Sequence, residues 1–256
     1  MVESNTWHSE VPNDAEFTLK RKRDLLSIAS QPHFRDEGLA LLRVLGDEGF
    51  GHKNSWMGVP IIRLPEDMIL QQEIIWTEKP DLIIEVGVAR GGGLLFNASM
   101  QEAFGIKPNV IGIDNKVFEH TWEAVENSRY ASEIKILEGD SVSEKTKSEV
   151  SRFTKLSQKT LLVLDSDHSS RHVLNELEQF VPLLPVGSVI IVCDTLIDEF
   201  PPGKYQDRSW SDGKGPLDAI QRFLLKSDSV TPYFVHETRA LILTEIRDGV
   251  LKKVTE

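Results

Sequence analysis

A strand, a glycine-rich turn and a helix follow one another at residues 82–100, and this pattern most constrains the fold of the 256-residue chain. The apolar run 82–84 ends in the acid Glu85, and Gly87 and the triplet 91–93 form the turn before an apolar helical pattern. Glycines let the backbone turn sharply and let a ligand come close to it. Unpaired N–H groups at the start of the following helix favour a carboxylate or a phosphate. The pattern is therefore typical of a ligand site in an α/β sheet.

Two classes of cofactor bind at turns of this kind. The dinucleotide fingerprint requires G-x-G-x-x-G, and the matching positions here are Gly87, Ala89 and Gly92, so the fit is incomplete. Glu85 stands two residues before the first glycine, where its carboxylate would repel a pyrophosphate and attract an ammonium group. In this respect the turn resembles the first motif of class I S-adenosylmethionine-dependent methyltransferases. The alternative is a glycine turn that binds no ligand.

Composition restricts the partners and the compartment. The net charge of −11 argues against nucleic acid or an anionic membrane as the main partner, because both require a basic surface. The single cysteine, Cys193, excludes an internal disulfide framework and suits a reducing cytoplasm. The polar leader carries no secretory signal, and no apolar run reaches the roughly 20 residues of a membrane span. We expect a cytoplasmic protein with an N-terminal helical extension and possible lid (1–65) and one domain (66–256).

Short apolar runs alternate with helical patterns in the domain, which favours a mostly parallel, Rossmann-like sheet with helices on both faces. The seven expected strands are 82–85, 109–113, 134–137, 160–164, 187–192, 233–236 and 240–245. The last two are expected to form an antiparallel edge hairpin, and the tail 248–256 is expected to cover that edge. Two helices, 14–30 and 36–45, precede the domain. The loop 53–67 is either a lid over the site or a packing strap across the sheet.

An acid follows each expected parallel strand. These acids are Glu85, Asp114, Asp140, Asp165 and Asp194. Ligands of a parallel sheet bind at the carboxyl ends of its strands, so we expect the acids to surround one site. Asp114 is placed to hydrogen-bond both ribose hydroxyls of an adenosyl group. In class I methyltransferases, which the turn resembles, an acid after this strand meets the adenine edge, and Asp140 is the candidate here. The alternative is that Asp140 caps the helix that opens at Ser141 or Ser143.

Asp165 and Asp194 follow strands that we expect to be neighbours. Two carboxylates brought together repel each other unless a cation or a proton lies between them, and Mg²⁺ is a hard cation that prefers oxygen ligands. The alternative is that one acid caps a helix and the other pairs with a lysine or an arginine. Asp167 and His168 follow Asp165 directly, and either could take the proton that an attacking hydroxyl loses.

Seven short motifs occur in order between residues 50 and 250. They are SWMGVPII (55–62), PDLIIEVGVARGG (80–92), VIGID (110–114), LDSDH (164–168), VCDT (192–195), DRSW (207–210) and GKG (213–215). Together they resemble the bacterial cephalosporin hydroxylase/rhamnosyl O-methyltransferase family. The resemblance implies a class I methyltransferase fold that binds S-adenosylmethionine, usually with Mg²⁺, and methylates hydroxyls of sugars or natural products. Related metal-dependent sugar O-methyltransferases have a metal-binding Asp at the position of Asp165 and a base at the position of Asp167 or His168.

The chain departs from the family pattern after the fifth strand. Several relatives carry an acidic pair there, whereas this chain has Cys193 and Asp194. Thr195, Asp198 or a water molecule would then complete the set of metal ligands. The cofactor contacts that we expect are Glu85, Gly87, Gly91, Asp114, Asp140, Ser141 and Asp165, and the expected metal ligands are Asp165, Asp194 and Thr195.

The predicted function is that of an S-adenosylmethionine-dependent O-methyltransferase with Mg²⁺, which acts on a small-molecule hydroxyl acceptor such as a sugar or a natural product. Loops 51–66 and 198–215 are expected to determine the acceptor, and the N-terminal helices are expected to form the interface of a homo-oligomer. Two rival hypotheses are an NAD-dependent oxidoreductase and a non-catalytic S-adenosylmethionine-binding protein of a biosynthetic assembly.

Overall fold

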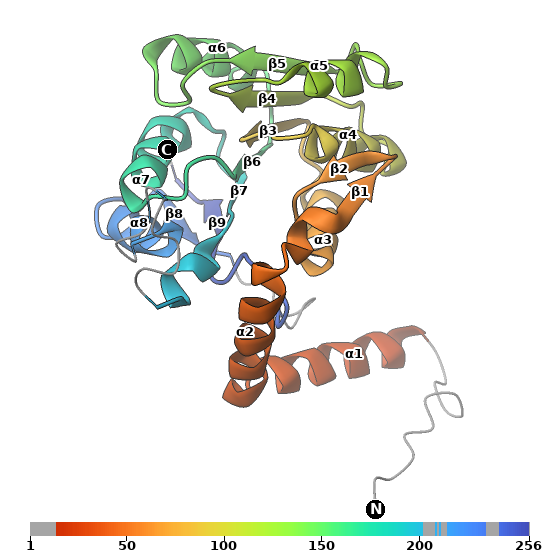
Figure 1. Ribbon diagram of the computed structural model, residues 1–256, viewed down its shortest axis with the longest axis vertical. Coiled ribbons are helices and arrows are strands. Elements are labelled where there is room, and N and C mark those ends of the chain that lie inside the picture. The colour runs from red at the N-terminus through yellow and green to blue at the C-terminus, as the bar shows by residue number, and fades with distance from the viewer. Residues whose placement is uncertain (1–13, 202–207, 209, 211–213, 234–240, 256) are drawn as a thin grey trace, which may run out of the picture.

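The computed structural model describes residues 14–201, 208, 210, 214–233 and 241–255 of the chain. An α/β body carries the two predicted N-terminal helices, which project from one of its ends (Figure 1). The helices are α1 (Asp14–Ala29), α2 (Pro32–Asp47), α3 (Pro65–Glu78), α4 (Gly92–Ala103), α5 (Glu119–Glu126), α6 (Glu144–Thr154), α7 (Ser170–Phe180) and α8 (Pro216–Leu224), with short 3-10 turns η1 (Phe50–Lys53), η2 (Val181–Leu183) and η3 (Thr195–Glu199). Within these described ranges, no helix is both long and apolar enough to cross a bilayer.

Among the described residues, seven strands form one sheet in the order β5-β4-β3-β6-β7-β9-β8. The strands are β3 (Leu82–Val86), β4 (Val110–Asp114), β5 (Ile134–Glu138), β6 (Thr160–Leu164), β7 (Val189–Val192), β8 (Val230–Pro232) and β9 (Val250–Lys253). Neighbouring strands from β5 to β7 pair in parallel, and β9 is antiparallel to both β7 and β8. The predicted mostly parallel sheet with an antiparallel edge is confirmed.

The central strands are apolar along their whole length because helices cover both faces of the sheet. Every residue of β3, β6 and β7 is buried. One face packs against α3 and α4 through residues such as Ile75 and Leu95. The other face packs against α6, α7 and α8 through residues such as Val150, Phe180 and Ile220. The two cores hold the carboxyl ends of the strands in fixed positions.

The segment that the sequence predicts as a loop before α3 contains a small hairpin, β1 (Asn54–Trp56) and β2 (Val59–Ile61). Its turn residues, Met57 and Gly58, both have positive φ, of 51° and 83°. A two-residue hairpin turn of this kind normally carries Asn-Gly or Asp-Gly, so the Met-Gly pair gives no recognisable signal. Trp56 packs edge-on against Phe96 of α4, and its Nε1 donates a hydrogen bond to Ser99 Oγ at 2.9 Å. The hairpin is thus packed against α4, and the choice between a lid and a packing strap stays a prediction.

The predicted closing hairpin is wrong in position. Residues 234–236 of its first strand lie outside the described residues, and 241–245 of its second strand form no strand. The backbone N–H groups of Leu243 and Glu245 instead donate to the carboxylates of Glu66 and Asp67 at the start of α3. The tail residues Val250–Lys253, which we expected only to cover the edge, form β9 and lie inside the sheet between β7 and β8.

Candidate active site

The order of the strands reverses beside β3, because β4 and β5 lie on one side of it and β6 and β7 on the other. Ligands of such sheets bind outside the carboxyl ends of the strands at this point. Val86 pairs with Leu164 in the register of β3 and β6, so the two chains leave the sheet side by side. A cavity of about 760 Å³ opens there. Of the predicted site residues, its lining includes Glu85, Gly87, Asp114, Asp165, Asp167, His168 and Asp194.

The glycine turn packs closely against its neighbours. Gly87 has a φ of 93°, and a Cβ at this position would overlap the carbonyl oxygen of Asp165. A Cβ at Gly92 would overlap the backbone of β2, and one at Gly93 would overlap the carboxylate of Glu85. Three of the glycines thus allow close approach between segments of the chain beside the cavity.

Glu85 is 3% exposed and lies at the end of β3, with its carboxylate against Gly93. Asn97 Nδ2 donates a hydrogen bond to its Oε2 at 2.6 Å. Burial raises the pKa of Glu85 to about 7, against the opposing effect of Arg63 and with a further increase from Asp165. A buried carboxylate at the cavity wall, with a second acid nearby, fits a ligand that carries an ammonium group.

Asp114 lies at the end of β4, beside the glycine turn. Its Oδ2 accepts hydrogen bonds from the backbone N–H of Val88 at 3.0 Å and of Ala89 at 3.4 Å, and its Oδ1 accepts from Lys116 N–H at 3.1 Å. These bonds fix the carboxylate at the mouth of the turn. Its position fits the predicted contact with two adjacent ribose hydroxyls.

Three other predicted cofactor contacts lie outside the cavity lining. Gly91 has a φ of 87° and faces Thr121 of α5. Asp140 is exposed, and its Oδ1 accepts from the N–H of the residue two positions on, which is a local turn. Ser141 is buried, and its hydroxyl donates to Glu176 Oε1 at 2.6 Å. Asp140 is not the cap of the following helix, because α6 begins at Glu144 and its N-cap is Ser143. The cofactor roles of Gly91, Asp140 and Ser141 stay predictions.

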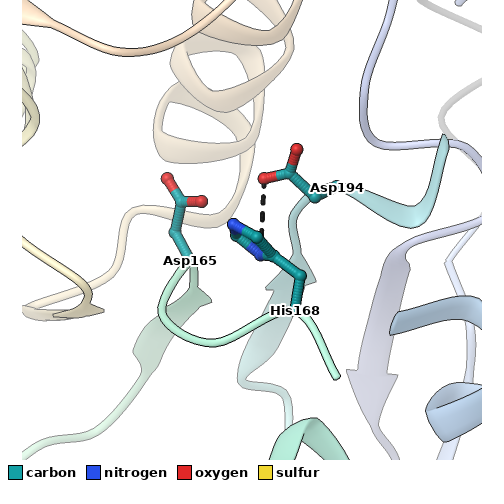
Figure 2. A group of neighbouring side chains, drawn as sticks. All are labelled: Asp165, His168 and Asp194. Atoms are coloured by element: carbon teal, nitrogen blue, oxygen red, sulfur yellow. Dashed lines mark ion pairs between the residues drawn. The ribbon is translucent and has the colours of Figure 1, made fainter. Parts of the chain in front are cut away.

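Asp165, His168 and Asp194 come together at the adjacent ends of β6 and β7 (Figure 2). One ligand atom from each lies within 4.8 Å of the others. His168 Nδ1 is 3.6 Å from Asp194 Oδ2. Burial raises the pKa of Asp194 to about 6, which His168 opposes and Asp165 reinforces. The structure therefore brings together the two acids that we predicted as metal ligands, and it adds an imidazole.

The donor set fits a divalent cation. Two carboxylates suit Mg²⁺, and an imidazole nitrogen also suits transition metals, so the ligand atoms alone do not select Mg²⁺. Thr195 is fully buried, and its hydroxyl donates to the carbonyl oxygen of Glu245 at 3.2 Å. Asp198 accepts three backbone hydrogen bonds at the start of α8. Neither residue lines the cavity, so this geometry does not favour Thr195 or Asp198 as the missing ligand.

Arg63 is a site residue that the sequence analysis missed. It is 3% exposed, and its Nη2 donates to Asp165 Oδ2 at 3.0 Å. Although burial lowers the pKa of Arg63, the neighbouring Cys193, Asp165 and Glu85 raise it above its ordinary value, so the guanidinium stays charged. The available signal was a lone arginine in the apolar run 60–64, because a buried cation requires acids nearby.

Asp167 and His168 have different surroundings. Asp167 Oδ1 accepts from the backbone N–H of Ser169 at 2.7 Å, just before α7. The His168 ring makes an edge contact with Trp210 at 4.8 Å between ring centroids. His168 thus stands between the acidic pair and an aromatic wall, whereas one oxygen of Asp167 is bonded to the local backbone. Both residues line the cavity.

The sheet order, the glycine turn at the switch point and the acids along one edge define the class I methyltransferase fold. An apo structure of CmcI covers 80% of this chain and 78% of its own length, with 19% identity and a TM-score of 0.56. A CmcI structure with Mg-SAM gives 19% identity and a TM-score of 0.55 over the same shares. A putative caffeoyl-CoA O-methyltransferase from Staphylococcus aureus covers 93% of this chain and 100% of its own, with 18% identity and a TM-score of 0.56.

The chain belongs to the rhamnosyl O-methyltransferase/CmcI family, whose model matches residues 48–254. Rhamnosyl O-methyltransferases of Mycobacterium bovis and Mycobacterium tuberculosis are 29% identical to it over 175 residues, which are 67% of this chain and 66% of the relatives. The Mycobacterium leprae protein of the same name is 29% identical over 170 residues, which are 66% of this chain and 69% of the relative. The chain thus spans about two thirds of the length of the curated relatives it matches.

Proposed function

We propose that this chain is an S-adenosylmethionine-dependent O-methyltransferase that methylates a hydroxyl group of a sugar-bearing or other natural-product small molecule. The observation that supports this most directly is the gathering of Glu85, Asp114, Asp165 and Asp194 around one cavity at the switch point of the sheet. Two facts about its relatives agree with it. Curated relatives are named rhamnosyl O-methyltransferase, and a CmcI structure of the same fold contains Mg-SAM.

In this proposal Glu85 and Asp114 hold opposite ends of the cofactor. Glu85 faces the methionine ammonium, and the positive charge favours the ionised carboxylate. Asp114, fixed by the backbone of the turn, accepts hydrogen bonds from the ribose hydroxyls. The glycines at 87, 92 and 93 lie in the wall beside these two acids, where they let the turn pack closely against Asp165, β2 and Glu85.

When bound, S-adenosylmethionine supplies an electrophilic methyl group, and Mg²⁺ supplies charge that makes a nearby hydroxyl more acidic. Asp165 and Asp194 would hold the ion, and in the ion-free protein Arg63 orients the Asp165 carboxylate through its 3.0 Å bond. His168 takes the proton of the acceptor hydroxyl: its Nδ1 faces Asp194, which leaves Nε2 as the proton acceptor. The walls of the cavity supply much of the acceleration by placing the hydroxyl in line with the methyl group.

The acceptor side of the cavity is partly apolar. The apolar side chains that line it away from the glycine turn are Leu42, Leu45, Phe50, Leu196, Ile197 and Phe200, with Arg208 and Trp210 beside them. Loops 51–66 and 198–215, which we predict to determine the acceptor, both contribute lining residues, and α2 contributes side chains that the sequence analysis did not expect. We infer that the acceptor has an apolar body, which carries the hydroxyl or the sugar that is methylated. The predicted division of the chain into an N-terminal extension and a domain at residue 65 stays a prediction. Side chains of α2, which lies before residue 65, line the same cavity as residues of the domain.

Methyl transfer from labelled S-adenosylmethionine to a panel of glycosylated natural products tests the proposal. Asp165→Asn and His168→Gln should each lower turnover about 100-fold or more, while S-adenosylhomocysteine still binds. A chelator should reproduce the effect of Asp165→Asn. Asp81→Asn is the control, because the Asp81 carboxylate accepts hydrogen bonds from Ser157, Gln158 and Lys159 outside the cavity, and it should keep turnover near that of the wild type.

The result also separates the rival functions. A wild-type protein that binds NAD and not S-adenosylmethionine would be an oxidoreductase. One that binds S-adenosylmethionine and methylates no acceptor in the panel would match the non-catalytic alternative. Full turnover in the presence of the chelator would end the metal proposal while leaving the methyltransferase proposal intact.

A further inference from the structure

Two buried amide side chains beside the cavity have no role in the mechanism above. Gln71 of α3 and Asn97 of α4 are both 0% exposed, and neither lines the cavity. Burying an amide is costly unless hydrogen bonds compensate for the lost water. Apolar side chains of similar size would pack between two helices without that cost, so the partners of these amides explain why they are there.

The amides complete a hydrogen-bonded chain between two acids of the site. Starting at one end, Arg63 Nη2 donates to Asp165 Oδ2 at 3.0 Å, and Arg63 Nη1 donates to Gln71 Oε1. Gln71 Nε2 donates to Asn97 Oδ1 at 2.5 Å, and Asn97 Nδ2 donates to Glu85 Oε2 at 2.6 Å. Asp165 and Glu85 are thus joined through three buried side chains, with no exposed group between them.

The direction of this chain is fixed by Arg63. A guanidinium can only donate hydrogen bonds, so each amide in turn must accept from the side of Arg63. Gln71 must therefore present its oxygen to Arg63 and its NH₂ to Asn97, and Asn97 must present its NH₂ to Glu85. Turning either amide over would place two donors or two acceptors face to face. Bonds that share one direction also polarise one another, which strengthens the whole chain.

We propose that Gln71 and Asn97 are positioning residues that couple the two acids, so that a cation bound at Asp165 changes the affinity for the cofactor at Glu85, and the reverse. A cation at Asp165 competes with Arg63 for the carboxylate. The hydrogen bond between the guanidinium and Gln71 then changes. Through the bond from Gln71 to Asn97 and the bond from Asn97 to Glu85, this change alters the position of the Glu85 carboxylate. The effect must be reciprocal, because it is a coupling free energy between two binding events. This inference rests on the proposed function, since it takes Glu85 and Asp165 as ligand-binding acids.

Gln71→Met tests the coupling, because it breaks the chain in the middle and leaves every proposed ligand-binding residue in place. The matched control is Gln101→Met. Gln101 of α4 is also 0% exposed, and it bonds Pro80 O at 3.0 Å and Asn109 N–H at 2.8 Å, away from the cavity. Both variants lose a buried glutamine with two partners, so a general loss of packing should affect them alike.

The readout is the dissociation constant of S-adenosylhomocysteine, measured by calorimetry with and without saturating Mg²⁺. In the wild type the two constants should differ about fivefold or more. In Gln71→Met the constants should differ by less than about twofold, and binding should be about tenfold weaker. Gln101→Met should keep both wild-type constants. Circular dichroism checks folding, and Gln71→Glu, which keeps the volume and the bond from Arg63 but cannot donate to Asn97, replaces Gln71→Met if that variant unfolds.

The outcomes distinguish the coupling from the function. A wild type that binds no S-adenosylhomocysteine would overturn both proposals. A wild type that binds and turns over, with equal constants at zero and saturating Mg²⁺, would overturn the coupling alone. The coupling would also fail if Gln71→Met kept the wild-type ratio, or if Gln101→Met lost the ratio to the same extent.

Discussion

At the carboxyl edge of the sheet, contacts within the protein already limit which residue types fit at some positions, independently of any ligand. Gly87 has positive φ and sits against the carbonyl oxygen of Asp165, where β3 and β6 leave the sheet. The neighbour is backbone, which cannot rotate away as a side chain would. A glycine that the sequence marks as a cofactor contact is therefore also a requirement of the fold.

Gly87→Ala should lower the free energy of unfolding by about 2–4 kcal/mol, because it adds both backbone strain and a steric overlap. The control is Gly105→Ala, since Gly105 has a φ of 73° and nothing within 4 Å of an added Cβ. That change should cost only about 1 kcal/mol from the positive φ. Urea unfolding of both variants measures the difference, and equal losses would show that the contact with Asp165 contributes nothing.

The sequence predicts the acids of the site better than their counter-ions. Glu85, Asp114, Asp165 and Asp194 follow apolar runs, and parallel strands must place such residues on one edge. Arg63 lies on no strand of the main sheet, and only the packing of 60–64 against the glycine turn brings it to Asp165. Long-range placement of this kind leaves no periodic pattern in a single sequence.

At the scale of elements, the parallel strands were predictable and the antiparallel strands β8 and β9 were not. β3, β6 and β7 are continuous apolar runs, which only a doubly covered sheet explains. The sequence of β9 contains two lysines, which is typical of an exposed charged tail. In the structure, however, Lys253 is only 1% exposed. Its Nζ donates to the carbonyl oxygen of Leu184 at 2.7 Å, so a carbonyl compensates for the burial. The sequence alone does not show that a carbonyl group far away in the chain accepts the hydrogen bond of this buried lysine.

Around the cavity, the part of the chain that the structure describes holds more buried or partly buried acid than buried base. Burial raises the pKa of Asp67 and of Glu85 to about 7 and that of Asp194 to about 6. Arg63 is the nearby cation that opposes all three increases. At neutral pH the ionised forms of these acids cost free energy, and positively charged ligands would offset that cost. This agrees with a site for an ammonium group and a divalent ion.

The ligand-free protein should therefore be less stable at pH 7.5 than at pH 5.5. Between these values the unfolded chain has already lost the carboxyl protons of Asp67 and Glu85, whereas the folded chain still holds them at the lower pH, so stability falls as pH rises. His172 acts in the same direction, because its bond to Glu176 raises the pKa of the imidazole. Thermal unfolding should show a Tm at least about 3 °C lower at pH 7.5. A Tm that rises across this interval would contradict the buried-acid account.

The central claim is that the acids along one edge of the sheet bind an adenosyl cofactor and a divalent ion next to each other. A crystal structure grown with S-adenosylhomocysteine and Mg²⁺ tests it most directly. The account predicts the ribose at Asp114, the amino group at Glu85 and the ion held by Asp165 and Asp194. A cofactor bound elsewhere on the chain, or an ion bound away from both aspartates while the cofactor occupies the cavity, would contradict it.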